Sequence, residues 1–445
     1  MAGTQGSLIM SSLWKHLRDT LCSFWSDKET TRIVLLLVAT QIGAILCGVT
    51  IFPHGFQYVH NNLFHKLMVW DGARYLLIGE HGYSWNHEFC VKHYCEIAFF
   101  PLQGMLDRTI FSIFFSAFGI NVVLAFIILL SWIFGLLSIF YFARLARAIM
   151  EQGARNAIFL FAFYPGSVFC LMGYPTGLIS VLAIMAVLSV LQDHWWRAAL
   201  WIGIGTAAAP AMVFVGIPIG IFYLIQQFKK NQSASFLLSV PVWAIVALSG
   251  LLLFMIYQYY AFGTPLAFIE AQDAWGATPG FLGKIHRLIT PGWYLGYYRE
   301  VIAWINIAYR KPVTGYGLGA FALQGQILHL SDFFELEFQS IVNLLFLFLG
   351  WAGVILCWFF CFGKTNKYLL CAIGFCVIAG YMWFVGTAAM SIQSTIRLIF
   401  PALSIFIGLG GITAKFKILE FWLFPLFVGL TFMHMAYVVS GYIVI

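Results

Sequence analysis

Of the 445 residues, 62% are hydrophobic, 18% are aromatic and only 9% are charged, which excludes a soluble protein and predicts a polytopic membrane protein. The formal net charge of +7 comes mainly from basic residues in short loops between apolar runs, so it does not indicate a nucleic-acid-binding protein. No internal repeat, low-complexity tract or soluble domain of ordinary size interrupts the apolar runs.

Residues 1–32 precede the first apolar run. Within them Leu13, Leu17 and Leu21 recur every four residues among charged residues, a spacing that predicts an interfacial helix on the cytosolic membrane surface. The run that begins at Ile33 has no small-residue cleavage site behind it, so we interpret it as an uncleaved anchor rather than a signal peptide.

A helix needs about 20 apolar residues to cross about 30 Å of hydrocarbon. Residues 198–225 are ambiguous, because Pro210 interrupts them and the two halves would also fit a hairpin that enters the membrane and returns. We therefore predict a single all-α transmembrane domain over residues 33–445, with about 11 transmembrane or half-membrane helices. The apolar runs are 33–53, 119–142, 157–173, 175–191, 236–257, 340–362, 368–388, 398–413 and 419–442.

Basic residues mark the cytosolic loops. By the positive-inside rule these loops face the cytoplasm, and segments 54–118 and 258–339 then form two larger extracytoplasmic loops on the opposite side. Most of the seventeen acidic residues fall in those two segments, so we expect the chemistry on the extracytoplasmic face. The basic positions are Arg144, Arg147, Arg155, Arg197, Lys229, Lys230, Lys364, Lys367, Lys415 and Lys417.

Asp71 lies just beyond the first apolar run, between Trp70 and Gly72. Apolar and aromatic neighbours suit a carboxylate that acts as a general base. Asp is also a favoured helix N-cap, and Arg74 follows three residues later, so capping of the next helix is the alternative. Spacing alone favours the cap.

Four other charged positions are candidates for a pocket. Glu96 opens the stretch EIAFFPL and is either a second pocket acid or a solvated loop residue, and Glu80 and His81 in GEHGY stay equally open. Arg397 stands at the extracytoplasmic start of an apolar run, where a charge costs about 2.5–3.5 kcal/mol on insertion scales and needs a partner such as a phosphate. The alternative is that Arg397 extends to the membrane interface.

The stretch HEFCVKHYC at 87–95 carries four potential zinc ligands within nine residues. Ligands packed this tightly have difficulty reaching tetrahedral geometry, so we do not predict a metal site. A local disulfide between Cys90 and Cys95, outside the reducing cytosol, is left open.

Residues 257–276 leave the membrane through a Gly-Thr-Pro turn. Phe268, Gln272 and Trp275 then follow helical spacing, which predicts a surface helix with one face toward a lipid or a sugar. Aromatic residues are also common at bilayer interfaces without any ligand, and that alternative stays open.

Six stretches in order along the chain form one pattern: WDG at 70–72, HGY at 81–83, EIAFFP at 96–101, YPGSVFCLMGYPTGL at 164–178, YAFGTPLAFIEAQDAWG at 260–276 and STIRLIFPAL at 394–403. Together they resemble the GPI mannosyltransferase 2 (PIG-V) family and its prokaryotic relatives. Several motifs in the family's order are far more specific than any one of them.

The resemblance implies a GT-C glycosyltransferase fold. It also implies transfer of a sugar, mannose in this family, from a polyprenyl-phosphate donor to a glycolipid or other acceptor hydroxyl on the extracytoplasmic or luminal face. Asp71 is then the expected base and Arg397 the expected contact to donor phosphate, and direct displacement inverts the anomeric centre. No cofactor is required, and a divalent metal ion remains compatible with the scheme. The expected substrate-binding residues are Trp70, Arg74, Glu80, His81, Glu96, Gln272 and Trp275.

Three departures from the family pattern concern the substrates. The central turn at 174–177 reads YPTG without the family's Glu, the hairpin at 206–212 reads TAAAPAM, and GTP at 263–265 replaces Gly-Asp-Pro. They favour a prokaryotic relative in the cytoplasmic membrane over an enzyme of the endoplasmic reticulum. A lipid or solute transporter and a non-catalytic lipid-binding protein of the same fold are the alternative functions.

Overall fold

The computed structural model describes residues 27–50, 62–69, 71–90, 95–230, 235–275, 280–290, 294, 330–386 and 394–440. Over these ranges the chain forms helices and no strands, so the all-α prediction is confirmed. Trp70 and the region predicted as the interfacial helix before residue 27 lie outside the described residues, as does most of the second loop beyond residue 294.

Long helices alternate with short helical segments along the chain. The longer ones are α2 (Lys28–Thr50), α4 (Asp71–His81), α6 (Pro101–Phe118), α7 (Ile120–Ile149), α8 (Ala154–Ala162), α9 (Thr176–Leu191), α10 (Trp195–Thr206), α11 (Ala211–Lys230), α12 (Ser235–Ala247), α13 (Ser249–Phe262), α15 (Phe281–Ile289), α18 (Leu330–Phe360), α19 (Lys364–Gly380), α21 (Ser404–Lys415) and α22 (Lys417–Ser440). The short ones are α3 (Leu63–Lys66), α5 (His87–Cys90), η1 (Glu96–Ala98), η2 (Pro165–Cys170), α14 (Ala267–Glu270), η3 (Ala271–Trp275), the π-helical turn η4 (Tyr381–Gly386) and α20 (Thr395–Leu398).

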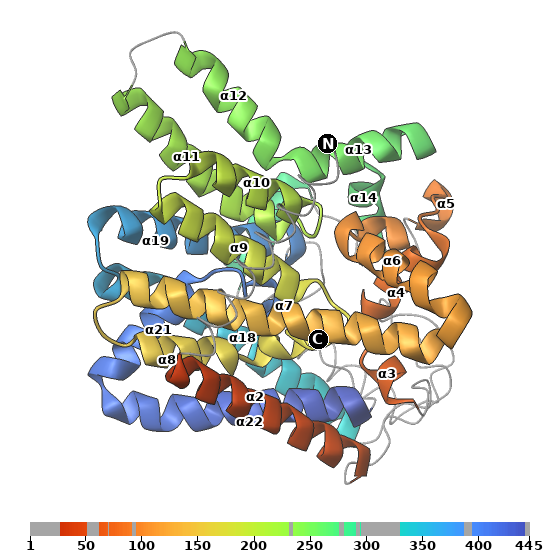
Figure 1. The fold of residues 1–445 in the computed structure, drawn as a ribbon, viewed down its shortest axis with the longest axis horizontal. Coiled ribbons are helices and arrows are strands. Elements are labelled where there is room, and N and C mark those ends of the chain that lie inside the picture. The colour runs from red at the N-terminus through yellow and green to blue at the C-terminus, as the bar shows by residue number, and fades with distance from the viewer. Residues whose placement is uncertain are drawn as a thin grey trace, which may run out of the picture.

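Six helices within the described ranges are long and apolar enough to cross a membrane: α2, α7, α11, α18, α19 and α22. A seventh span is formed if α12 and α13, which meet at an angle of 68°, are counted together. The protein is therefore a multi-pass membrane protein. In Figure 1, α2, α7 and α22 run side by side, and α3, α4, α5, α6 and α14 gather at one end.

The structure changes several of the predicted apolar runs. The run 398–413 is not one helix, because α20 ends at Leu398 and α21 begins only at Ser404. Residues 157–173 do not form one helix, because α8 ends at Ala162 and Pro165, which has no N–H to donate, starts the 3₁₀ segment η2. The apolar run 236–257 is bent between α12 and α13. Residues 198–225 divide near Pro210 as expected, but the second part, α11, is long enough to cross the membrane by itself.

Aromatic side chains fill the centre of the bundle. Phe161 on α8 stacks on Phe142 of α7 with ring centroids 4.3 Å apart and on Phe400 at 4.8 Å. Helices approach closely where glycine removes the side chain, since a methyl group on Gly408 would lie 2.0 Å from the carbonyl oxygen of Gly353. Small residues at helix contacts are the usual solution in membranes, where the lipid competes for apolar contacts.

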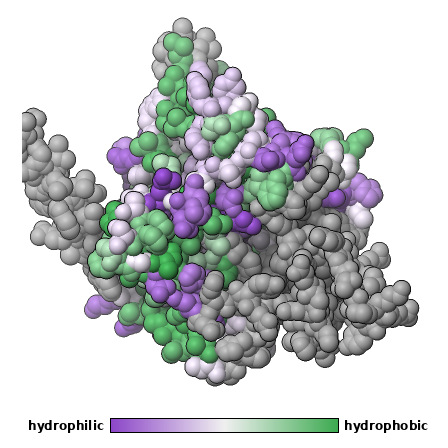
Figure 2. Space-filling view, turned by 90° about the vertical axis from the view of Figure 1, so that its right-hand side faces the viewer, coloured by the Kyte–Doolittle hydropathy of each residue, from purple (hydrophilic) through white to green (hydrophobic). Residues whose placement is uncertain are grey.

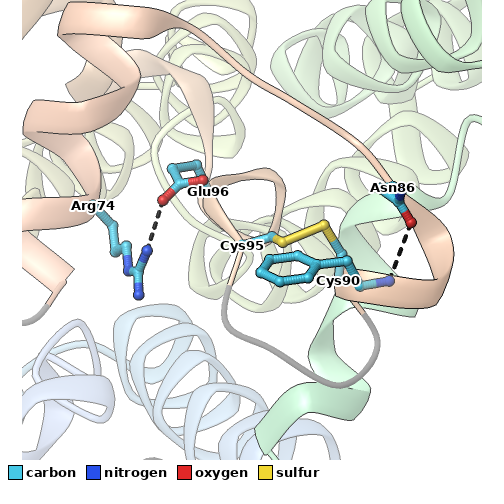
Figure 3. Close-up of a disulfide and its surroundings, with 6 residues drawn as sticks. Arg74, Asn86, Cys90, Cys95 and Glu96 are labelled. Atoms are coloured by element: carbon cyan, nitrogen blue, oxygen red, sulfur yellow. Dashed lines mark hydrogen bonds and ion pairs between the residues drawn. A yellow bond between two sulfur atoms is a disulfide. The ribbon is translucent and has the colours of Figure 1, made fainter.

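A smaller apolar cluster lies where the loop before η1 meets α13 and α14. Cys90 and Cys95 form a disulfide in it, with Cα atoms 5.3 Å apart (Figure 3), and they pack with Phe254. His87 Nε2 lies 3.5 Å from Glu270 Oε2, which adds a polar contact between the same two parts. The disulfide uses both thiols, so neither can serve as a zinc thiolate.

Replacing Cys90 with Ser is expected to lower stability by about 2 kcal/mol, because the short loop gains freedom in the unfolded chain. The thermal midpoint of the purified protein should fall, and dithiothreitol should lower the wild-type midpoint but leave that of Cys90→Ser unchanged. Cys47→Ser, which removes a free thiol from α2, is the matched control. A wild-type midpoint that ignores the reductant would contradict the prediction.

Candidate active site

The start of α4 is placed by the central turn. Gly173 donates its N–H to the carbonyl oxygen of Leu67 at 3.1 Å, and Tyr174 Oη donates to that of Val69 at 2.9 Å. Gly72 packs against the same turn, since a methyl group there would lie 3.2 Å from the Gly173 carbonyl oxygen. Contacts from about 100 residues away thus determine where α4 begins.

Asp71 and Arg397 meet at this point. Arg397 Nη1 donates to Asp71 Oδ2, although 326 residues separate the two along the chain. The ion pair is partly buried, with 18% of the Arg397 side chain and 27% of the Asp71 side chain exposed. Asp71 is the first residue of α4, but its carboxylate binds a distant guanidinium, so capping does not account for the placement of this side chain.

Two aromatic rings hold the guanidinium of Arg397. Its Cζ lies 5.3 Å from the ring centroid of Tyr174 and 5.5 Å from that of Phe169. Cation–π contacts of this kind contribute about 0.5–2 kcal/mol, depending on desolvation. Burial disfavours the charged form, but the Asp71 carboxylate outweighs it and the pKa of Arg397 is raised. The sequence motifs did not single out either ring, although both lie in the stretch 164–178 that carries part of the family resemblance.

Arg74 and Glu96 form a second ion pair beside the first. Arg74 Nη1 lies 2.7 Å from Glu96 Oε1, with 34% and 18% of the two side chains exposed (Figure 3). Arg74 follows Asp71 by three residues on α4, so the two side chains share one face of the helix. Glu96 is therefore not a free solvated loop residue.

Glu80 and His81 lie at the far end of α4. They follow Asp71 by nine and ten residues, which at 1.5 Å per residue places them about 14 Å further along the helix. Their side chains are 35% and 68% exposed, and Glu80 Oε2 lies 3.7 Å from His81 Nε2. The structure therefore does not bring them to the Asp71–Arg397 pair. Figure 2 shows the face at this end of the molecule, where polar side chains gather among apolar ones.

Gln272 ties the second loop to the first. Its Nε2 donates to the carbonyl oxygen of Ala98 at 3.3 Å. The predicted continuous surface helix is wrong here, because α14 ends at Glu270 and a 3₁₀ segment, η3, follows it. With about three residues per turn, η3 does not keep the helical spacing on which the prediction rested. The Trp275 side chain lies outside what the structure describes.

Asp107 on α6 is a buried acid that sequence reasoning did not single out. Its Oδ1 accepts a hydrogen bond from Gln103 Nε2 at 2.8 Å, and its Oδ2 has no partner among the described residues. It faces α4, where a methyl group on Gly79 would lie 3.1 Å from Asp107 Cβ. Burial raises the pKa of Asp107 to about 8, although the Gln103 hydrogen bond acts in the opposite direction. The sequence offered one signal for this residue, which is that Asp107 is the single acid among the mostly apolar residues of α6.

Asp107→Asn is expected to remove a pH dependence of stability. Between the ordinary carboxyl pKa and about 8, the folded protein keeps a proton that the unfolded chain releases, so wild-type stability falls as pH rises through this window. Above about pH 8 both states are ionised and this contribution levels off. The thermal midpoint measured from pH 5 to pH 9 should therefore fall less steeply in the variant.

An exposed aspartate provides the control for loss of a negative charge. Asp193 lies on the loop between α9 and α10 and has a φ of 58°. Asn also tolerates this backbone region, so Asp193→Asn removes the charge without new strain. If Asp107→Asn and Asp193→Asn show the same pH slope as the wild type, Asp107 does not hold a proton in the folded protein.

Residues 34–279, more than half of the chain, match the family described as Mannosyltransferase (PIG-V). The chain belongs to this family. The matched residues include Asp71, the Arg74–Glu96 pair and the central turn, but end before Arg397. For this family member, the link between Asp71 and Arg397 therefore rests on the structure.

Relatives of known name are similar to parts of the chain. GPI alpha-1,6-mannosyltransferase 2 of Cricetulus griseus is 26% identical over 211 residues, 43% of this chain and 40% of that protein. GPI alpha-1,6-mannosyltransferase 2 of Mus musculus is 26% identical over 246 residues, 51% of this chain and 47% of that protein. The aligned region thus spans less than half the length of these relatives.

Proposed function

We propose that this protein is a membrane mannosyltransferase that moves mannose from a polyprenyl-phosphate donor to a hydroxyl of a glycolipid or related acceptor. Asp71 acts as the base and Arg397 binds the donor phosphate. The observation that carries the proposal is their direct contact, because it joins a proton acceptor and a phosphate-binding cation in one partly buried site. Membership of the mannosyltransferase family supports the same reaction class.

The reaction needs one base and one cation. Asp71 takes the proton of the acceptor hydroxyl as its oxygen bonds to the anomeric carbon of mannose. The bond from that carbon to the phosphate oxygen breaks, and polyprenyl phosphate leaves with the electron pair. Phosphate is a good leaving group, so no general acid is required. Attack from the side opposite the phosphate inverts the anomeric centre, and a β-linked donor gives an α-linked product.

Arg397 can bind the donor phosphate while it keeps its ion pair with Asp71. A guanidinium carries five N–H donors in a planar fork, and the ion pair with Asp71 is made through Nη1. The other donors suit phosphate oxygens, whose charge grows as the bond to the sugar breaks. Preorganised donors aimed at developing charge are often the largest single contribution to catalysis. Tyr174 and Phe169 restrict the guanidinium to this orientation.

The residues around this pair suggest two substrate regions. Arg74 and Glu96 lie beside Asp71 and suit hydroxyl groups of the transferred sugar or of the nearest acceptor sugar. Glu80 and His81 lie further along α4 and suit more distant parts of an acceptor. Gln272, which donates to the carbonyl oxygen of Ala98 just after Glu96, would line the second side of the site.

The donor's lipid tail explains why the catalytic unit is a membrane domain, which we place over residues 33–445 with its site on the extracytoplasmic or luminal face. The basic loops on the other side support this orientation. We favour the cytoplasmic membrane of a prokaryote, because the central turn and the GTP turn depart from the family pattern. The endoplasmic reticulum is the alternative, and the mammalian relatives carry names of GPI mannosyltransferases.

Purified protein in lipid vesicles tests the proposal. The vesicles receive tritium-labelled polyprenyl-phosphate mannose in their outer leaflet and contain glycolipid acceptors. We expect labelled glycolipid to form, and NMR of the product should show that the new linkage is α. Movement of the donor across the bilayer without transfer would instead support a transporter. Absence of transfer with every mannose donor and acceptor supplied would contradict the proposal.

A further inference from the structure

The turn that carries Arg397 is fixed by buried hydrogen bonds from two other helices. Thr395 donates its backbone N–H to Asn343 Oδ1 of α18 at 2.9 Å, and Thr395 Oγ1 lies 2.7 Å from Tyr381 Oη at the end of α19. Thr395 is fully buried, and Asn343 and Tyr381 are 2% and 4% exposed. These bonds are therefore shielded from water, and removing one partner would leave a buried polar group unpaired.

The backbone conformation of Ser394 and a close contact with η2 also constrain the turn that carries Arg397. Ser394 has a φ of 53°, in the left-handed region that non-glycine residues rarely adopt, and its carbonyl oxygen accepts the N–H of Arg397 at 3.1 Å. η2 touches the same turn, since a methyl group on Gly166 would lie 2.1 Å from the Ile396 carbonyl oxygen. Strained backbone persists only where surrounding contacts determine it, and it gathers at functional sites.

We propose that Asn343, Thr395 and Tyr381 are positioning residues that set where Arg397 presents its guanidinium to the donor phosphate. None of them touches substrate. Tyr381 is the first residue of the π-helical turn η4, and its hydroxyl points to Thr395. π-Helical turns are rare in proteins, and those that occur are often found at functional sites. The inference rests on the proposed function, because it assigns these residues through Arg397.

Tyr381→Phe removes one hydroxyl and keeps the ring. Loss of one buried hydrogen bond corresponds to about 0.5–1.5 kcal/mol, so we expect the KM for the donor to rise about threefold to tenfold. The KM for the acceptor should stay unchanged, because Asp71 and α4 are not altered. Thr395→Val should act in the same direction, and Thr395→Ser, which restores the hydroxyl, should recover the wild-type donor KM.

Tyr164→Phe is the matched control. Tyr164 is buried in the same region, stacked on Phe400, but its hydroxyl has no hydrogen-bond partner in the described part of the chain. A purely structural effect would reduce the fraction of folded enzyme, lowering the apparent kcat while leaving both KM values unchanged. If Tyr381→Phe and Thr395→Val keep the donor KM within twofold of wild type, or Tyr164→Phe raises it equally, the positioning role is wrong.

A combined variant tests whether the effect passes through Arg397. In an Arg397→Lys background the fork that Tyr381 positions is absent, so adding Tyr381→Phe should raise the donor KM no further. A full additional rise would mean that Tyr381 acts on the donor by another route and would overturn the inference.

A chemical measurement separates this inference from the proposed function. In a protein carrying both Asp71→Cys and Arg397→Cys, a short bifunctional thiol reagent should bridge the two positions. Proteins that carry only one of these two substitutions give the background from the natural cysteines. Adding Tyr381→Phe should slow bridging, and adding Tyr164→Phe should not. This readout needs no sugar transfer, so an inactive wild type would contradict only the proposed function, whereas equal bridging rates would contradict the positioning role.

Discussion

Replacing Asp71 with Asn should reduce the rate of mannose transfer about 10²–10⁴-fold, the usual contribution of a positioned general base. The amide cannot take the acceptor proton, but its oxygen can still accept the hydrogen bond from Arg397 that holds α4 and α20 together. We therefore expect kcat to fall while the KM for the donor changes little. Initial rates with polyprenyl-phosphate mannose, normalised to folded protein, measure the effect.

Asp193→Asn is the control for this substitution. It makes the same chemical change on the loop between α9 and α10, where Asp193 Oδ1 accepts a hydrogen bond from Gln226, and should leave transfer at the wild-type rate. If Asp71→Asn transferred mannose as fast as wild type, Asp71 would not be the base, and the carboxylate of Glu96 would be the next to replace.

Arg397→Ala should weaken the apparent affinity for the donor about 30-fold or more. Truncating one partner of a buried, hydrogen-bonded charge pair costs about 2–5 kcal/mol, and here both Asp71 and the bound phosphate lose their cation. Arg397→Lys should be intermediate, because Lys keeps the charge but not the planar fork. The KM for the donor, measured at saturating acceptor, reports the loss.

Arg155→Ala is the matched control for Arg397. Arg155 is an exposed arginine on α8 whose Nε lies 3.5 Å from Glu29, and exposed pairs of this kind contribute about 0–1 kcal/mol. Its replacement should leave the donor KM unchanged. An unchanged donor KM in Arg397→Ala would remove the phosphate role from Arg397 and, with it, the purpose proposed for Tyr381 and Thr395.

Much of the helical architecture was predictable, because runs of about 20 apolar residues satisfy their backbone only as helices in lipid. α2, α7, α18 and α22 lie where such runs occur. One failure has a local cause, because Pro165 divides the run at 157–173. The angle of 68° between α12 and α13, in contrast, has no counterpart in composition.

The site was predictable only as separate motifs. Asp71 and Arg397 each belong to a recognisable stretch, but spacing along the chain favoured a helix cap for the first and left extension to the interface open for the second. No local pattern could show that Arg74 binds Glu96, or that Asp107 on α6 lies against Gly79 of α4. Such pairs depend on how helices distant in sequence cross.

The amino-acid sequence by itself determined that this protein is an all-α membrane protein of the mannosyltransferase family, because composition and ordered motifs are properties of the chain. Only the tertiary structure decided which charges are paired. It brings Asp71 to Arg397, places the rings of Tyr174 and Phe169 at the guanidinium, and buries Thr395 in the same turn. The physical reason is that a charge in an apolar chain needs a partner, and the packing of helices determines which partner is within reach.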